Sequence, residues 1–403
     1  MALTLVVSFY SVWAIVGLWS RAPRRLIVFR AIATTFTIVV VLIIVELPAL
    51  AGMIDYNHIL RLVTGEWSGP ATHFETDPDL SFRRPRRKFW SGRPRSDMAA
   101  AWNLPIRSET EQRFTTDSQG YRNLREITAA DIALIGDSYI EGAYVSDDET
   151  CAVALERLTG RPVVNLGVSG YGSLQQLKVL ERHALPLGPR LIAWFFFEGN
   201  DLYDDQEYEN AILYRYDGAE SASAGLELDW SNFGEVSFVA NSFRLFRRMC
   251  HPLVPNSVAT FGWFRDERGQ QHRLYFYGYG SMRFDDFERG RLEKTANAFR
   301  QGKAICDREK IKLVAFFIPM KFRVYDAYCT YHPESPCREW EPWELPDRFR
   351  ELCEGIGVPL VDLTGPMRRA AESGKLLYAP EDSHWNRRGH EFVAELVRDQ
   401  WED

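Results

Sequence analysis

The chain has 403 residues and a formal net charge of −7 at neutral pH. That length suits one core domain with appendages, and 25 Phe, 17 Tyr and 12 Trp residues are ample material for a hydrophobic core. The acidic balance gives no reason to expect nucleic acid as a partner, and the sequence has no internal repeat or low-complexity tract.

Residues 1–54 are predicted to form a transmembrane hairpin. Ala2 to Trp19 is an uncharged apolar run of 18 residues, and a second apolar run extends from about Leu26 to Ile54. Each run is long enough to cross a bilayer of about 30 Å as a helix. The second run carries Arg30 near one end and Glu46 near the other. The alternative, a buried hairpin in a soluble core, is disfavoured because soluble helices rarely lack a polar face altogether.

Arginines gather around the turn between the two runs: Arg21, Arg24, Arg25 and Arg30. Because basic loops stay on the cytoplasmic side of a membrane, we expect this turn in the cytoplasm and both termini outside. In a bacterium, the rest of the chain would then face the periplasm or the outside of the inner membrane. A cleaved signal peptide is disfavoured, since its positive charge would precede the apolar core.

Six cysteines occur without a Cys-x-x-Cys pair. Cys329 and Cys337 flank a loop-like stretch that a disulfide could close, which requires an oxidising compartment. For the other four cysteines, reduced and partly buried thiols are an equal alternative. The histidines and cysteines show no standard zinc-ligand spacing, so no metal is expected.

Residues 55–125 form a linker and lead-in segment with few regular apolar periods. A basic cluster from Arg83 to Lys88 is followed by Phe89 and Trp90. Such a cluster could bind lipid head groups or an acidic polysaccharide. A solvated linker is the favoured alternative.

From residue 126 onward, strands and helices alternate as a parallel sheet requires, which predicts a three-layer α/β/α sandwich over 126–403. Apolar runs predict strands at Asp131–Ile135, Pro162–Leu166, Leu191–Phe197, Leu313–Ile318 and Val358–Leu363. Helical periods predict helices at Thr150–Leu158, Ser173–His183, about Phe287–Lys310, Pro346–Gly355 and from about Asn386 onward.

One segment, from about residue 202 to 286, interrupts this alternation. It holds many aromatic residues, and we expect no long amphipathic helix in it. Because structureless loops of that length are uncommon inside domains, we interpret it as an insertion that folds over the catalytic edge. Its aromatic rings could stack on sugars, although a small local hydrophobic core is the commoner explanation.

Polar and glycine-rich motifs stand at predicted strand ends or in loops, the last of them where the final helix begins, and the chemistry of an open parallel sheet is usually found at that edge. We therefore expect them to meet at one edge. In chain order they are Gly136-Asp-Ser138, Asn165-Leu-Gly-Val-Ser-Gly170, Glu198-Gly-Asn-Asp201 and Pro380-Glu-Asp-Ser-His384.

Acyl transfer needs the residue types that these motifs supply. A serine hydroxyl is a poor nucleophile until a base takes its proton, and imidazole has a suitable pKa. This assigns Ser138 as the nucleophile and His384 as the base. The tetrahedral intermediate needs convergent donors, which the backbone N–H groups of Ser138 and Gly170 and the side-chain amide of Asn200 would supply as an oxyanion hole.

Taken together, these residues resemble the SGNH (GDSL-type) hydrolase superfamily. Gly136-Asp-Ser138 is similar to its first block, Gly170 to its second, and Gly199-Asn-Asp201 to its third, while Asp382 and His384 fall where its fifth block lies. The resemblance covers about residues 130–403. It implies that the serine is acylated and that the acyl group passes to water or an acceptor hydroxyl, without a metal or organic cofactor.

The acid that partners His384 departs from the commonest pattern of this superfamily. Its esterases usually have Asp-x-x-His, but Glu381 stands three residues before His384. Asp382-Ser-His384-Trp385 instead resembles the Asp-x-His-Trp motif of alginate O-acetyltransferase-type members, which acetylate bacterial exopolysaccharide. In those proteins the motif precedes the serine. We favour Asp382 as the acid that orients His384, with Glu381 as the open alternative.

Other polar residues near the motifs are given structural roles. His390 on the last helix is interpreted as structural, and Asp137 as a brace for the turn before Ser138. Ser169 and Ser383 are loop serines without a matching pattern. Lys321 could reach the edge of the site, but a solvated lysine is the favoured prediction.

The sequence thus predicts a membrane-anchored serine ester hydrolase or O-acyltransferase. Its substrates would be acyl esters, with acetyl favoured, of cell-envelope or exported carbohydrate. Its partners would be the membrane, through residues 1–54, the carbohydrate ester or acceptor, and an acyl-donor membrane protein. Two alternatives stay open: a non-catalytic glycan-binding envelope protein on the same scaffold, and a lipid esterase.

Overall fold

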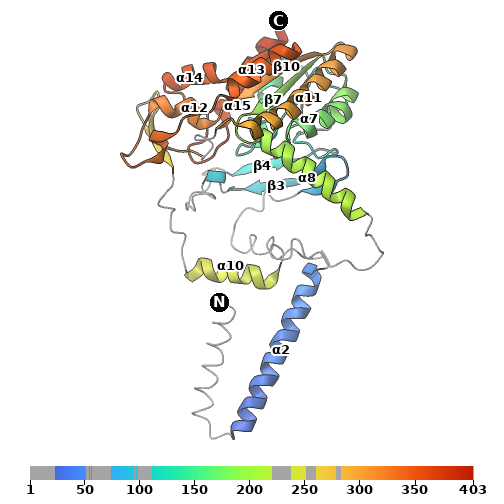
Figure 1. The fold of residues 1–403 in the computed structure, drawn as a ribbon, viewed down its shortest axis with the longest axis vertical. Coiled ribbons are helices and arrows are strands. Elements are labelled where there is room, and N and C mark those ends of the chain that lie inside the picture. The colour runs from blue at the N-terminus through green and yellow to red at the C-terminus, as the bar shows by residue number, and fades with distance from the viewer. Residues whose placement is uncertain are drawn as a thin grey trace. The chain divides into compact units, whose positions relative to one another are not determined.

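The computed structural model describes residues 23–50, 54, 56, 74–94, 96–98, 111–219, 237–250, 260–277 and 283–402 (Figure 1). The first predicted membrane span, Ala2–Trp19, lies outside these residues. The chain divides into two compact units, one of Met1–Gly65 with Ser223–Pro252 and the other of Glu66–Ala222 with Leu253–Asp403.

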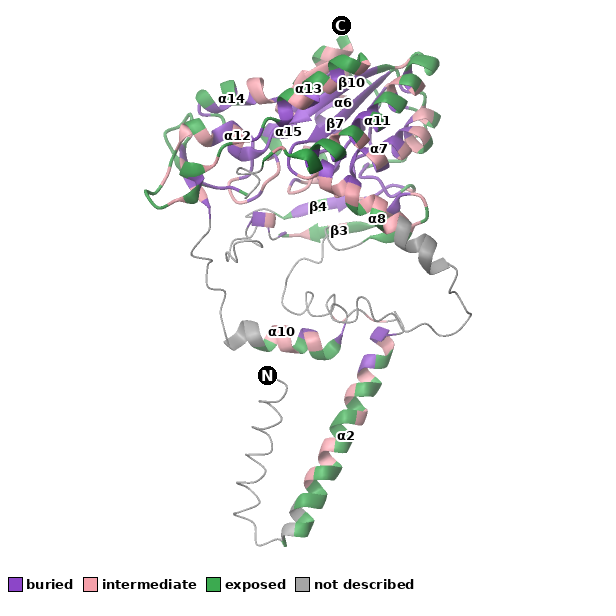
Figure 2. Cartoon of the chain, viewed as in Figure 1, coloured by how far each residue is buried: buried purple, intermediate pink, exposed green. Residues whose placement is uncertain are grey.

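The first unit contains one long apolar helix, α2 (Arg24–Leu50). Figure 2 colours much of it as exposed, and its most exposed large side chains include Phe29 and Phe36. The stretch Val28–Leu50 is long and apolar enough to cross a membrane, with a mean hydropathy of 2.5. The described residues therefore contain one apolar helix near the amino terminus, where the sequence predicted a hairpin of two.

Two helices lie in the segment where the sequence analysis expected no long amphipathic helix, and that expectation is wrong. Helix α8 (Asp201–Ala219) belongs to the second unit, and α10 (Phe238–Cys250) belongs to the first. In α10, Val239, Phe243 and Phe246 recur at i, i+4 and i+7, as in an amphipathic helix. A high aromatic content, which drew attention in the sequence, does not distinguish helix from strand.

The second unit is built on a five-stranded sheet in which every neighbouring pair of strands is parallel. In spatial order the strands are β12 (Leu360–Asp362), β10 (Lys312–Ile318), β7 (Leu191–Phe197), β5 (Ile132–Ile135) and β6 (Val163–Asn165). All five predicted strands are confirmed. Their residues are mostly apolar because helices cover both faces of the sheet, and β7 is buried along its whole length.

The order of the strands explains where a site can form. From β5 the chain first moves outward to β6 and then returns to β7 on the other side of β5. Such a reversal leaves a crevice at the carboxyl ends of the two central strands, β5 and β7. The residues that follow these two strands therefore start on opposite sides of one opening.

The five predicted helices are present, with small shifts at their ends. They are α6 (Cys151–Thr159), α7 (Ser173–Val179), α11 (Asp286–Glu309), α13 (Leu345–Ile356) and α15 (Arg387–Glu402). Helix α6 packs against α15, while α11 packs against α7, α8 and α13, so the helices form two groups. Further helices of this unit are α5 (Ser138–Glu141), α12 (Lys321–Tyr325) and α14 (Thr364–Glu372).

Small antiparallel sheets occupy the lead-in segment and the second half of the unit. Strands β1 (Glu75–Asp77) and β2 (Ser81–Arg83) pair, as do β3 (Phe89–Gly92) and β4 (Gln112–Thr115). Strands β8 (Phe261–Arg265), β9 (Gln271–Tyr275) and β11 (Cys329–Thr330) form a third sheet. Cys329 and Cys337 are both free thiols, so the disulfide proposed from the sequence is not formed in this structure.

The basic cluster of the lead-in segment is not a solvated linker. Arg84 is only 2% exposed, and its guanidinium makes a bidentate ion pair with Glu141 at 2.7 and 2.8 Å. Arg87, in contrast, is an exposed residue that pairs with Glu126 at 3.5 Å. The cluster therefore combines a buried anchor, which ties the lead-in segment to the end of α5, with ordinary surface charge.

Candidate active site

Ser138 is the first residue of α5, directly beyond the end of β5. Asp137 caps this helix, and its Oδ1 accepts a hydrogen bond of 3.0 Å from the Tyr139 backbone N–H. A Cβ atom at Gly136 would lie 2.7 Å from Ile140 Cγ1 and 3.1 Å from Phe195 Cβ, so the turn is too tight for a side chain there. This geometry presents the Ser138 hydroxyl at the carboxyl edge of the sheet.

A continuous chain of hydrogen bonds joins Ser138 to two residues of the loop before α15. Ser138 Oγ lies 2.8 Å from His384 Nε2, and His384 Nδ1 lies 2.6 Å from Asp382 Oδ1. Asp382 Oδ1 also accepts the backbone N–H of His384 at 3.0 Å. Glu381 points elsewhere, because its carboxylate accepts a hydrogen bond from the Tyr144 hydroxyl.

The electrostatics of this chain favour a proton on the imidazole. Burial alone would lower the pKa of His384, but the charge and hydrogen bond of Asp382 outweigh it and raise this pKa to about 9. Burial would likewise raise the pKa of Asp382, yet the neighbouring His384 charge lowers it to about 2. The pair can therefore hold the imidazolium that forms when a base takes a proton from a hydroxyl.

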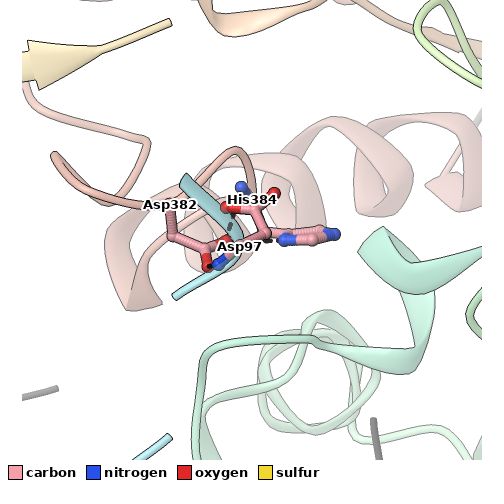
Figure 3. A group of neighbouring side chains, drawn as sticks. All are labelled: Asp97, Asp382 and His384. Carbon is pink, nitrogen blue, oxygen red and sulfur yellow. Dashed lines mark hydrogen bonds and ion pairs between the residues drawn. The ribbon is translucent and has the colours of Figure 1, made fainter. Parts of the chain in front are cut away.

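Asp97, a residue of the lead-in segment, meets this chain from the other side (Figure 3). Its backbone N–H donates to Asp382 Oδ2 at 2.9 Å, and its Oδ1 accepts the Ser383 backbone N–H at 2.9 Å. Burial, followed by the nearby charge of Asp382, raises the pKa of Asp97 to about 6. The sequence analysis missed this residue, because no motif marks an aspartate that is brought to the site from so far along the chain.

Asp97, Asp382 and His384 could be mistaken for a metal site, since one ligand atom of each lies within 4.8 Å of the others. Both carboxylates, however, already accept hydrogen bonds from backbone N–H groups. His384 uses its two ring nitrogens for Asp382 and Ser138. Hydrogen bonding therefore accounts for the grouping of these three residues.

Lys321 is buried, which corrects the prediction of a solvated lysine. Its ammonium group donates to the carbonyl oxygens of Ala379 and Pro380 at 3.0 Å and of Asp382 at 2.8 Å. Burial lowers its pKa to about 8. Lys321 thus fixes the loop that carries Asp382 and His384, and only the tertiary structure reveals this role.

The loop after β6 brings Gly170 to the same opening. Gly170 has a φ of +80°, a conformation that favours glycine. The preceding residue, Ser169, donates a hydrogen bond from its hydroxyl to the buried carboxylate of Glu141. Ser138 is the first residue of α5, so its own backbone N–H has no acceptor within that helix.

Asn200 follows β7 and lies across the opening from the end of β5. Its side-chain amide donates a hydrogen bond of 2.6 Å to Asp204 Oδ2 on the first turn of α8. Within the described part of the chain, its Oδ1 is buried without a hydrogen-bond partner. The amide is therefore held by one of its two N–H groups, which leaves the other available.

The site residues predicted from the sequence border one cleft with a volume of about 780 Å³. Ser138, Gly170, Asn200, Asp382 and His384 are among its lining residues, so the structure brings together every site residue predicted from the sequence. Aromatic and acidic side chains form other parts of the wall: Phe74, Phe82, Phe114, Tyr144, Phe197, Tyr208, Tyr277, Asp97, Asp204 and Glu207.

Comparison with known proteins gives one family and several structures. The model of the GDSL-like lipase/acylhydrolase family matches residues 134–392. Among curated proteins, none is significantly similar to this chain in sequence.

Three of the solved structures that are similar to this chain are esterases or lipases. The acetyl xylan esterase AlAXEase shares 10% identity over 67% of this chain and 98% of its own, with a TM-score of 0.35. A lipase/acylhydrolase from Enterococcus faecalis shares 14% sequence identity over 67% of this chain and 93% of its own, with a TM-score of 0.32. A two-domain esterase active on acetylated mannans shares 11% sequence identity over 68% of this chain and 49% of its own, with a TM-score of 0.32.

Proposed function

Since this chain belongs to the GDSL-like lipase/acylhydrolase family and is a serine esterase of the SGNH type, we propose that it is a membrane-anchored hydrolase or O-acyltransferase for acyl esters of carbohydrate. The observation that carries this proposal is the hydrogen-bonded chain from Ser138 through His384 to Asp382. It supplies a nucleophile, a base and an orienting acid in the order that acyl transfer requires.

The reaction starts when Ser138 Oγ attacks the ester carbonyl while His384 Nε2 takes the hydroxyl proton. Asp382 holds the imidazolium through Nδ1. The oxyanion of the tetrahedral intermediate accepts hydrogen bonds from the backbone N–H groups of Ser138 and Gly170 and from the amide of Asn200. When the intermediate collapses, the alcohol leaves with the proton from His384 and the acyl group stays on Ser138 as an ester.

The second half of the reaction decides between hydrolysis and transfer. His384 takes a proton from either water or an acceptor hydroxyl, and the oxygen of that molecule attacks the acyl-serine. Attack by water gives a free acid, and attack by an acceptor hydroxyl gives a new ester. In both cases Ser138 recovers its proton from His384. Both outcomes use the same residues, so they differ only in which molecule occupies the cleft.

Features of the cleft support carbohydrate, with acetyl as the acyl group. Its volume of about 780 Å³ far exceeds an acetyl group and suits a ligand of several rings. Phe82, Tyr208 and Tyr277 offer ring faces against which sugars can stack, while Asp204 and Glu207 can accept hydrogen bonds from hydroxyl groups. Aromatic rings beside carboxyl groups suit a ring-shaped ligand that carries hydroxyl groups.

The anchoring in this proposal is supported by α2, whose Val28–Leu50 stretch has the length and hydropathy of a membrane span. With the arginines near its start in the cytoplasm, the chain beyond α2 would lie outside the inner membrane of a bacterium. Exported or cell-envelope polysaccharide would be within reach there. An acyl-donor membrane protein could supply the acetyl group to Ser138.

The decisive experiment uses the full-length protein in detergent or vesicles with an activated acetyl ester, with and without acetylatable oligosaccharide. Acetyl appearing on sugar identifies a transferase, and free acetate alone identifies an esterase. Ser138→Ala should abolish both activities and the labelling by a serine-directed phosphonate, whereas Ser373→Ala, at an exposed serine, should change neither. If Ser138→Ala still binds glycan and the native protein turns over no ester, a glycan-binding role replaces this proposal.

A further inference from the structure

Glu46, near the end of α2, binds the first turn of α10. Its carboxylate accepts hydrogen bonds from the Ser237 hydroxyl at 2.7 Å and from the backbone N–H groups of Phe238 at 3.0 Å and Val239 at 2.7 Å. These N–H groups have no acceptor within their own helix, and a negative charge at a helix amino terminus is favourable. Glu46, only 8% exposed, is therefore a joint between two helices rather than a flaw in an apolar run.

This joint determines the depth of α10 along the apolar helix. The 23 residues of Val28–Leu50 extend over roughly 34 Å, slightly more than a hydrocarbon core of about 30 Å. Glu46 precedes Leu50 by about one helical turn, or roughly 6 Å. The amino terminus of α10 therefore lies close to one boundary of the span, and Figure 1 shows α10 running across the end of α2 rather than along it.

Helix α10 has an apolar side and a polar side. Val239, Phe243 and Phe246 share one side, while Asn241 and Arg244 share another and are joined by a hydrogen bond of 3.1 Å. In the sequence, two more arginines follow Arg244 after three and four residues. A helix that divides apolar from polar side chains in this way is typical of a membrane interface.

Apolar side chains of α10 are exposed, together with the polar Ser242, while Phe243 is half-buried. Phe238, Val239 and Phe246 are 38%, 46% and 50% exposed, whereas the polar Ser237 and Asn241 are buried (Figure 2). A surface helix of a water-soluble protein shows the reverse arrangement. Helix α2 carries its large apolar side chains outward in the same way, so both described helices of this unit expose apolar side chains.

We propose that α10 is an interfacial helix, which lies in the head-group layer of the bilayer that α2 crosses. Its exposed Phe and Val side chains would insert among the upper parts of the acyl chains. Arg244 would bind the phosphate of an anionic lipid. The chain would then meet the membrane twice, at α2 and at α10. This inference rests on the anchoring by α2 that is part of the proposed function.

The test measures the depth of single positions in the full-length protein, reconstituted into vesicles of phosphatidylcholine and phosphatidylglycerol. An environment-sensitive fluorophore is attached at Phe246→Cys, with Arg244→Cys as the control for the polar side of α10 and Phe36→Cys as the control for the span. Cys250→Ser and Cys329→Ser remove two native thiols, and the other four cysteines are buried. Lipids that carry a nitroxide at a shallow or a deep acyl position then quench the fluorescence.

We expect the Phe246→Cys label to be quenched mainly by shallow nitroxides, at least about threefold more strongly than the Arg244→Cys label. The Phe36→Cys label should be quenched mainly by deep nitroxides. If Phe36→Cys is quenched but Phe246→Cys is not, α2 is inserted and protein rather than lipid covers α10, which overturns this inference alone. If neither is quenched, the anchoring fails as well.

Discussion

The backbone N–H of Asp97 donates a hydrogen bond of 2.9 Å to the carboxylate of Asp382, although 285 residues separate the two. Asp97 in turn accepts hydrogen bonds from the backbone N–H and the hydroxyl of Ser383. The lead-in segment thus supports the acid of the proposed triad from behind. Asp97 touches neither Ser138 nor the position of a substrate carbonyl, so we treat it as a positioning residue.

Replacing Asp97 should change the pH dependence of the reaction. Its negative charge is one of the factors that raise the pKa of His384, so Asp97→Asn should lower that pKa. Because His384 must be neutral to act as a base, the acid limb of kcat/KM should move to lower pH by up to about one unit. Ser383→Ala removes a hydrogen bond of Asp97 without removing a charge, and its acid limb should stay in place. If the acid limb of kcat/KM lies at the same pH for both variants, Asp97 has only a structural role.

The identity of the orienting acid can be tested in the same profile. With a His384 pKa near 9, kcat/KM of the native enzyme should rise with pH and reach a plateau only above about pH 9. Asp382→Asn removes the negative charge that raises the pKa of His384 against the effect of burial. The acid limb of kcat/KM should therefore move to lower pH, while its plateau falls by about 10³- to 10⁴-fold. Glu381→Gln should leave both nearly unchanged. The reverse result would make Glu381 the acid.

The strands and the main helices could be predicted because each depends on local sequence. Buried parallel strands are uninterrupted apolar runs, as at Leu191–Phe197, and amphipathic helices show their period directly. Ser138 could be predicted because it follows a buried strand at the edge where parallel strands end, and His384 because of its motif before the last helix. For such residues, the motifs in the sequence and the topology of the sheet together predict that they meet at one site.

The supporting residues could not be predicted, because their environment is set by distant parts of the chain. Arg84 belongs to a run of basic residues that looks solvated, and only the tertiary fold places Glu141 beside it. Lys321 has no motif, since its three acceptors are backbone carbonyls whose sequence is arbitrary. Glu46 was visible as an anomaly in an apolar run, but its partner α10 lies about 190 residues further on.

Lys321 should matter for stability and for activity. Lys321→Met keeps much of the apolar stem but leaves three carbonyl oxygens without their donor, so the free energy of unfolding should fall by about 2–4 kcal/mol. The loop that carries His384 would also shift, which should lower kcat by on the order of 100-fold. Denaturant unfolding and ester turnover measure the two effects. Lys375→Met, at an exposed lysine, is the matched control and should change stability by less than about 0.5 kcal/mol.

Arg84 and Arg87, two arginines of the basic cluster, should differ sharply in their contribution to stability. Arg84→Leu leaves the carboxylate of Glu141 buried without its bidentate partner, which should cost about 3–5 kcal/mol of unfolding free energy. Arg87→Leu breaks only an exposed pair with Glu126 and should cost at most about 1 kcal/mol. Unfolding by urea, followed by circular dichroism, gives both values. Similar losses of unfolding free energy for the two variants would mean that Arg84, like Arg87, behaves as an ordinary surface residue.

Asn200 should contribute to the transition state and not to substrate binding. Asn200→Ala removes an oxyanion donor, which should lower kcat by about 10²- to 10³-fold, or roughly 2.7–4 kcal/mol, with little change in KM. Asp204→Ala removes the acceptor that holds this amide at 2.6 Å, so it should produce a smaller loss of kcat in the same direction. Burial raises the pKa of Asp204 well above its ordinary value, so the carboxyl group of Asp204 tends to be protonated. Asp204→Asn keeps a neutral acceptor at this position and should restore most of the activity. Steady-state kinetics of the three variants on one acetyl ester would decide, because an Asn200→Ala enzyme that lost only affinity would place this amide on the substrate instead of the oxyanion.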